Sequence, residues 1–135
     1  MDFRNGSHSI KIIDNIVYIN IDEDFNEHDI KAITTELKLL IERFQQKEFL
    51  LLIDIKNCEG GTPEGYEESR KFNIWLDEQN LTAKAIVSSS SIFIQINESR
   101  VRDTNKQRIQ YFENQKDAVN WLQSFLEKSS KVLKS

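Results

Sequence analysis

The sequence predicts an α/β fold: a single domain in which about four helices cover a mixed sheet of five strands. The first indication is the segment FLLLIDI at 49–55, which is apolar at six of its seven positions and does not alternate. Such a run is typical of a central strand that is covered on both faces. The second is the order ββαβαβαβα, in which parallel neighbours must be joined by crossover helices. The length of 135 residues suits one domain.

The first third of the chain predicts a hairpin followed by a long helix. Two runs rich in β-branched residues, 8–13 and 16–21, flank the polar pair Asp14-Asn15, which is expected to form the turn. Residues 26–46 have the apolar spacing of an amphipathic helix, with Asn26 and Asp29 as a capping pair. Its predicted buried stripe is Ile30, Ile33, Leu37, Leu40, Ile41 and Phe44.

The middle of the chain predicts a helix and a strand after the apolar run. Pro63 suits the first position of a helix that continues to about Gln79, and Thr62 suits its N-cap. Residues 82–87 are predicted to form the next strand.

The last third predicts a crossover helix, a strand and a final helix. Residues 92–103 fit either a strand or a short helix, and we predict a helix because a crossover is required there. A strand at 108–112 and a helix at 114–127 complete the order. The polar tail from about 129 is expected to fray, so residues 1–135 form one domain with a frayed end.

Composition and charge argue against several classes of protein. The net charge of −4 disfavours nucleic-acid binding, which usually shows a basic balance. No stretch approaches the roughly 20 apolar residues of a membrane span, and the N-terminus lacks a signal-peptide core. The single Cys58 cannot form an intrachain disulfide and suits a reducing compartment, so we predict a cytoplasmic protein.

The chain shows no motif for catalysis, cofactor binding or metal binding. Neither GxGxxG nor GxxxxGK[ST] occurs, and no set of nucleophile, base and orienting residue is evident. His8 and His28 lack metal-ligand spacing and are expected at the surface. We therefore predict that the protein is not an enzyme and has no catalytic, cofactor-binding or metal-binding residues.

The chain resembles the STAS domain family, and in particular the small stand-alone SpoIIAA-like proteins described as STAS/SEC14 domains. The segments that carry the resemblance are FLLLIDI at 49–55, AIVSSSSIF at 85–93 and IQYFENQKDAVNWLQSFL at 109–126. In this family a last strand ending in Phe leads to a helix with acidic residues at its start and an Ala-x-x-Trp-Leu motif. The matching residues here are Phe112, Asp117, Ala118, Trp121 and Leu122.

The resemblance implies, first, a regulatory module that binds proteins. Anti-sigma-factor antagonists of this fold bind a kinase-like partner and are phosphorylated on a hydroxyl in the loop before the second helix, which typically reads Asp-Ser-Ser-Gly. That signature is missing here, where Thr62 is the only nearby hydroxyl and Glu59 and Glu64 would repel a phosphate. We interpret Thr62 as an N-cap rather than a phospho-acceptor. The predicted interaction loop consists of Lys56, Asn57, Cys58, Glu59, Gly60, Gly61, Thr62, Pro63 and Glu64.

The resemblance implies, as an alternative, a carrier or sensor of a small apolar, lipid-like ligand in a SEC14-like pocket between the second and third helices and the sheet. Aromatic side chains are expected to line it, although any core also requires them. The candidates are Phe72, Trp75, Phe93 and Trp121. The expected partner is thus an unknown protein or a small apolar molecule, and homodimer formation is a further option that rests on the resemblance alone.

Overall fold

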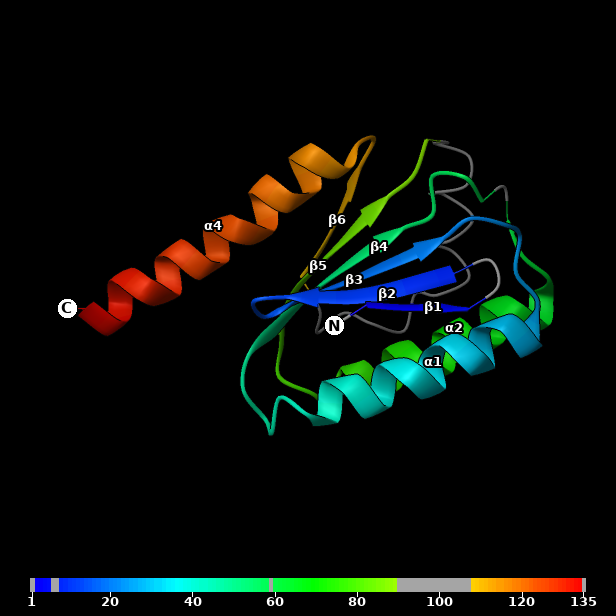
Figure 1. Cartoon of the computed structure of the whole chain (residues 1–135), viewed down its shortest axis with the longest axis horizontal. Helices are drawn as coiled ribbons and strands as arrows, with labels where there is room; N and C mark the ends of the chain where they lie inside the picture. Colours follow the sequence, from blue (N-terminus) through cyan, green and yellow to red (C-terminus); the bar gives the residue numbers. More distant parts are fainter. Residues whose placement is uncertain (1, 6–7, 59, 90–107, 135) are drawn as a thin grey trace.

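The computed structural model shows a mixed sheet with helices on both of its faces (Figure 1), and it describes residues 2–5, 8–58, 60–89 and 108–134. Within these residues the sheet has six strands, which lie side by side in the order of the sequence. They are β1 (Asp2–Asn5), β2 (His8–Ile13), β3 (Ile16–Ile21), β4 (Phe49–Asp54), β5 (Leu81–Val87) and β6 (Ile109–Phe112).

The sheet changes from antiparallel to parallel at β3. Strands β1, β2 and β3 are antiparallel neighbours, whereas β3 to β6 are parallel. The α/β class and the predicted strands are confirmed, because the five expected strands correspond to β2–β6. Strand β1 is an addition that sequence patterns did not indicate, since its residues DFRN carry a single apolar side chain.

The predicted hairpin joins β2 and β3, and its turn depends on Asp14. This residue has a φ of 57°, a left-handed conformation that Asp tolerates better than most residues. The turn therefore forms without a glycine.

Helix α1 (Glu27–Glu42) begins at the predicted capping pair. The Asp29 amide donates to Asn26 Oδ1 at 3.0 Å, and the Asn26 amide donates to Asp29 Oδ2 at 3.0 Å. The helix ends before the predicted residue 46, because Gln45 and Gln46 have left-handed φ values of 51° and 71°.

Helix α2 (Pro63–Leu76) and helix α4 (Gln115–Lys134) also form where expected. Thr62 is the N-cap of α2, with the Gly65 amide donating to Thr62 Oγ1 at 3.0 Å. Helix α4 continues beyond the predicted end at 127, to Lys134. No Gly or Pro interrupts its sequence. The third predicted helix, at 92–103, lies outside the described residues.

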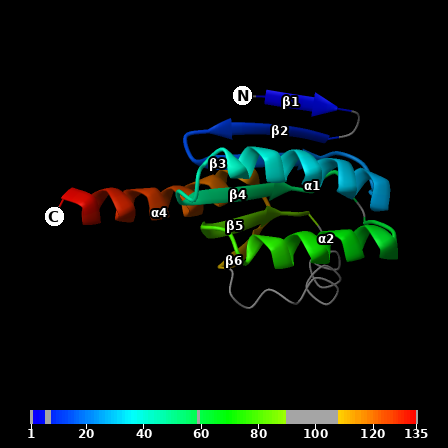
Figure 2. The same cartoon turned by 90° about the horizontal axis from the view of Figure 1, so that it is seen from below.

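The two faces of the sheet carry separate apolar layers. Helices α1 and α2 cover one face, and α4 covers the other (Figures 1 and 2). Strand β4 supplies both layers: Phe49 and Leu51 face α1 and α2, whereas Leu50 and Leu52 face the side of α4. All four side chains are at most 1% exposed, which explains why this strand shows no alternation.

Candidate functional site

The predicted interaction loop, residues 56–64, lies at the carboxyl end of β4. Because β3 and β4 are parallel neighbours, the loop that follows β3, residues 22–26, emerges at the same edge of the sheet. An isolated parallel bridge pairs Phe25 with Gly61 and joins the two loops. We call residues 22–26 and 56–64 together the double loop; Glu59 lies outside the described residues. In open α/β sheets this edge is the usual place for binding.

Hydrogen bonds hold the two segments of the double loop together. The Phe25 amide donates to the Gly60 carbonyl at 3.3 Å, and the Thr62 amide donates to the Phe25 carbonyl at 2.9 Å. The Gly60 amide donates to Asp24 Oδ1 at 3.1 Å. Backbone groups of both loops are thus paired with each other, as they would be in a short stretch of sheet.

Gly61 is required because the ring of Phe25 lies directly over it. A Cβ atom on Gly61 would lie 2.2 Å from Phe25 Cε2, which is far inside van der Waals contact. The ring is itself held, since Phe25 is 6% exposed and packs edge-on against Tyr66 with 5.2 Å between ring centroids. This close approach explains one glycine of the predicted loop.

Cys58 faces the interior of the double loop. Its side chain is 5% exposed and belongs to the core, and its Sγ lies 3.3 Å from the Gly60 carbonyl oxygen. The Cys58 amide donates to the Ile55 carbonyl at 3.0 Å, which closes a tight turn after β4. A thiol in this position packs as a small apolar side chain.

The outer surface of the double loop is polar and mainly acidic. Residues of both segments, among them Asp24, Asn26, Gly60 and Thr62, line a depression on this surface. In the described part of the double loop the exposed charged residues are Asp22, Glu23, Asp24, Lys56 and Glu64, and the other exposed residues include Asn57, Thr62 and Pro63. This composition favours contact with a basic surface over contact with an acidic one.

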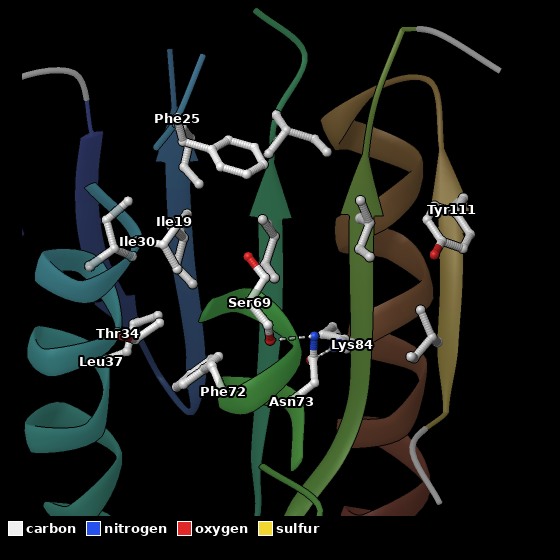
Figure 3. A pocket seen from close by; sticks show the side chains of 16 residues that line it. Ile19, Phe25, Ile30, Thr34, Leu37, Ser69, Phe72, Asn73, Lys84 and Tyr111 are labelled. Carbon is white, nitrogen blue, oxygen red and sulfur yellow. Dashed lines mark hydrogen bonds between the residues drawn. The ribbon is translucent and has the colours of Figure 1, made fainter. Parts of the chain in front are cut away.

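A separate cavity of about 100 Å³ lies between α1, α2 and the sheet (Figure 3). Its walls are mainly isoleucine side chains from β3 to β6 and apolar residues of the two helices. The polar residues in its lining are Thr34, Ser69, Asn73, Lys84 and Tyr111.

Lys84, on β5, is the charged residue in this lining, and it is 2% exposed. Its ammonium donates a hydrogen bond to Asn73 Oδ1 on α2, and Asn73 Nδ2 donates to the Ser69 carbonyl at 3.0 Å (Figure 3). Burial lowers the pKa of Lys84 from its ordinary 10.5 to about 7, and the carboxylate of Asp77 acts in the opposite direction. Charged and neutral forms are therefore both accessible near neutral pH.

The four aromatic residues predicted to line one pocket do not lie together. Phe72 lines the cavity, and Trp75 stacks on Phe72 with 5.6 Å between ring centroids. Trp121 lies on the other face of the sheet, where it packs against Phe112. Its inclusion was wrong because helix periodicity identifies a buried face without showing which side of the sheet the helix covers. Phe93 lies outside the described residues.

Sequence reasoning missed two buried polar residues, Lys84 and His8. Lys84 lies two residues before the apolar Ile86 and therefore on the same face of the strand. This spacing was the available signal that Lys84 is buried. His8 was expected at the surface but is 6% exposed, with its Nε2 3.2 Å from Glu36 Oε2. Pairing with β3 and a carboxylate on α1 account for its burial, and neither is visible in local sequence.

In the described part of the chain, no three His, Cys, Asp or Glu side chains are grouped as metal ligands. None of its helices combines the length and apolarity needed to cross a membrane.

Solved structures of the same fold exist at low sequence identity. An uncharacterized protein with a SpoIIAA-like fold from Shewanella loihica PV-4 is 17% identical, with a TM-score of 0.69 over 90% of this chain and 98% of that chain. The anti-sigma factor antagonist SpoIIAA in its unphosphorylated form is 8% identical, with a TM-score of 0.58 over 86% of this chain and 97% of that chain. Both likenesses concern the fold. No sequence among curated proteins matches.

A family model described as SpoIIAA-like matches residues 16–123, which run from the start of β3 into α4. The match covers most of the chain and agrees with the resemblance that the sequence suggested. The chain therefore belongs to the SpoIIAA-like family.

Proposed function

We propose that this protein is a non-enzymatic regulatory module that binds a partner protein through the double loop. The observation that carries the proposal is the pairing of two loops into one surface at the carboxyl edge of the parallel strands. A surface that is ordered before binding loses little conformational entropy when a partner docks on it. The related fold of an anti-sigma factor antagonist supports a role in protein interaction.

The charge of this surface indicates the kind of partner. Asp22, Glu23, Asp24 and Glu64 are exposed around one lysine, Lys56. Complementary charge speeds association and disfavours partners of like charge, so the proposed partner presents a basic patch.

The proposed module works without phosphorylation of Thr62. Thr62 Oγ1 accepts the capping hydrogen bond from the Gly65 amide, and its side chain is exposed beside Glu64. A phosphate there would gain from the N-terminus of α2 but would be repelled by the acidic surface of the double loop. We therefore propose that partner binding does not depend on phosphorylation of Thr62.

The test is quantitative affinity enrichment with three immobilised proteins: the wild type, the double-loop variant Glu23→Lys/Glu64→Lys, and the control Glu42→Lys/Glu78→Lys. Both variants change the net charge by the same amount, and the control residues are exposed near the carboxyl ends of α1 and α2, away from the double loop. The expected result is a basic protein retained by the wild type and the control but lost by the double-loop variant. Equal retention by all three proteins would contradict the proposal.

The alternative of a lipid-like ligand is supported less well. Pockets that hold drug-sized molecules usually measure about 300 Å³ or more, and the cavity beside α2 measures about 100 Å³. Its size and its buried lysine suit a much smaller molecule.

A further inference from the structure

We infer that the cavity between α1, α2 and the sheet is a binding site for a short-chain monocarboxylate, with the Lys84 ammonium as its anchor. Phe25 of the double loop is also part of the cavity lining, but the inference does not depend on the proposed partner binding. Three features of the cavity carry the inference: its size, its apolar walls and its single cation.

The size of the cavity limits the ligand to a few heavy atoms. An engineered apolar cavity of about 150 Å³ in another protein holds benzene, which has six carbon atoms. A volume of about 100 Å³ therefore suits acids such as propionate or isobutyrate, which have about five or six heavy atoms. Fatty acids with long chains exceed this volume.

The walls of the cavity favour an apolar body. Both the sheet and the helices contribute aliphatic side chains, among them Ile19, Ile33 and Ile86. Each is at most 5% exposed. A branched aliphatic chain buried among them gains about 0.8 kcal/mol per CH₂ group, whereas a small inorganic anion would gain nothing from these contacts.

The polar groups of the cavity favour an anionic head. Among its described lining residues Lys84 is the cation and there is no carboxylate. The ammonium has three N–H donors, and within the described part of the chain Asn73 Oδ1 is its hydrogen-bond acceptor. A carboxylate oxygen would satisfy a remaining donor and compensate a buried positive charge.

The hydroxyl groups nearby do not replace Lys84 in this role. The hydroxyl of Ser69 donates to the Gly65 carbonyl at 3.2 Å, and that of Thr34 donates to the Lys31 carbonyl at 3.3 Å. Their hydrogens are used within the helices, and the third hydroxyl of the lining, that of Tyr111, is a neutral group. Lys84 is therefore the charged donor, which distinguishes an acid from a neutral molecule of the same shape.

The test compares isobutyrate with its neutral isostere isobutyramide by NMR titration of the isoleucine methyl groups. We expect isobutyrate to shift the methyl signals of Ile19, Ile33 and Ile86, and to bind about 10- to 100-fold more tightly than the amide, the range expected for a charge-assisted hydrogen bond. The variant Lys84→Met should lose this preference. The control Lys71→Met, which removes an exposed lysine of α2, should keep it.

Several results would overturn the inference. One is the absence of methyl shifts at about 10 mM acid, which would mean a binding free energy of less than about 3 kcal/mol. Another is equal affinity for the acid and the amide. A third is a set of shifts confined to methyl groups at the protein surface. Retained preference in a folded Lys84→Met protein would also refute it. If that variant does not fold, the comparison of acid and amide affinity for the wild type still tests whether the site prefers an anion. None of these results would affect the affinity-enrichment test of the double loop.

Discussion

Replacing Lys84 with methionine should stabilise the protein at pH 6 and remove a pH-dependent part of its stability. Methionine keeps an unbranched chain of similar length but has no charge to desolvate. Lys84 is 2% exposed, and burial lowers its pKa from 10.5 to about 7. The perturbation therefore removes a group whose charged form the folded protein disfavours.

The sign of the effect follows from proton binding. Between pH 7 and 10.5 the unfolded chain holds the Lys84 proton more tightly than the folded chain does, so the stability of the wild type rises with pH in this window. Below about pH 7 the full penalty applies, and above about 10.5 it vanishes. Asp77, the C-cap residue of α2, acts on this ammonium, and Tyr111 of β6 lines the same cavity; both titratable groups remain in the variant.

The magnitude follows from the same pKa values. A fall from 10.5 to about 7 corresponds to a penalty of about 5 kcal/mol in the charged state. The variant removes the hydrogen bond that Lys84 donates to Asn73 Oδ1, which costs about 1–3 kcal/mol. At pH 6 the variant should thus be more stable by about 2–4 kcal/mol, and at pH 10.5 it should be equal to the wild type or less stable by about 1–3 kcal/mol.

Urea unfolding at intervals from pH 6 to pH 10.5 measures this difference. Subtracting the two curves cancels the titration of all groups that the proteins share. The control Lys71→Met, at an exposed position with an ion pair to Glu68, should differ from the wild type by less than about 0.5 kcal/mol at every pH. A difference between wild type and Lys84→Met that stays constant across this range would refute the reasoning.

Three substitutions test the double loop and the opposite face of the sheet, each by urea unfolding. Gly61→Ala should destabilise by about 1–3 kcal/mol, because the new methyl group meets the held ring of Phe25; an unchanged midpoint would show that the ring yields freely. Thr62→Val should cost about 1 kcal/mol through loss of the cap on Gly65, with partner binding retained; loss of binding at unchanged stability would instead point to a regulatory hydroxyl. Trp121→Ala should cost about 3 kcal/mol, because this half-buried ring packs in the layer under α4; an unaltered stability would contradict that packing.

Strands β2 to β6 and helices α1, α2 and α4 were predictable because their signals are local. The unbroken apolar run of β4 indicates a strand that is buried on both faces, and the capping pair Asn26 and Asp29 marks the start of α1. Thr62 and Pro63 mark the start of α2 in the same way. Each signal comes from residues that are close together in the sequence, so it can be recognised without knowledge of the tertiary structure.

The arrangement of the two sites was not predictable, because it depends on contacts between distant segments. Phe25 and Gly61 are 36 residues apart in the sequence, and the residues around either of them do not indicate that the two are in contact. Lys84 resembles any solvent-facing lysine of a strand until α2 is placed over it. Trp121 has the periodicity of a buried residue, but its side of the sheet is set by the course of the whole chain.

Phe25 links the cavity to the double loop, since its ring lines the cavity and also covers Gly61. The backbone of Phe25 accepts a hydrogen bond from the Thr62 amide at 2.9 Å. Shortening this side chain should therefore loosen the double loop, whereas shortening another aromatic residue of the cavity should not. Phe72 provides the matched comparison, because it lines the same cavity from α2 and is 7% exposed against 6% for Phe25.

Amide hydrogen exchange of Thr62 distinguishes the two positions. Phe25→Leu and Phe72→Leu should each lower the global stability by about 1–2 kcal/mol, because both remove buried ring atoms. Exchange at Thr62 should accelerate by more than this global loss in Phe25→Leu, since local opening of the loops becomes easier. In Phe72→Leu it should follow the global loss alone. Equal acceleration in both variants would mean that the double loop is held by its hydrogen bonds without help from the ring, and that the cavity and the double loop are independent structures.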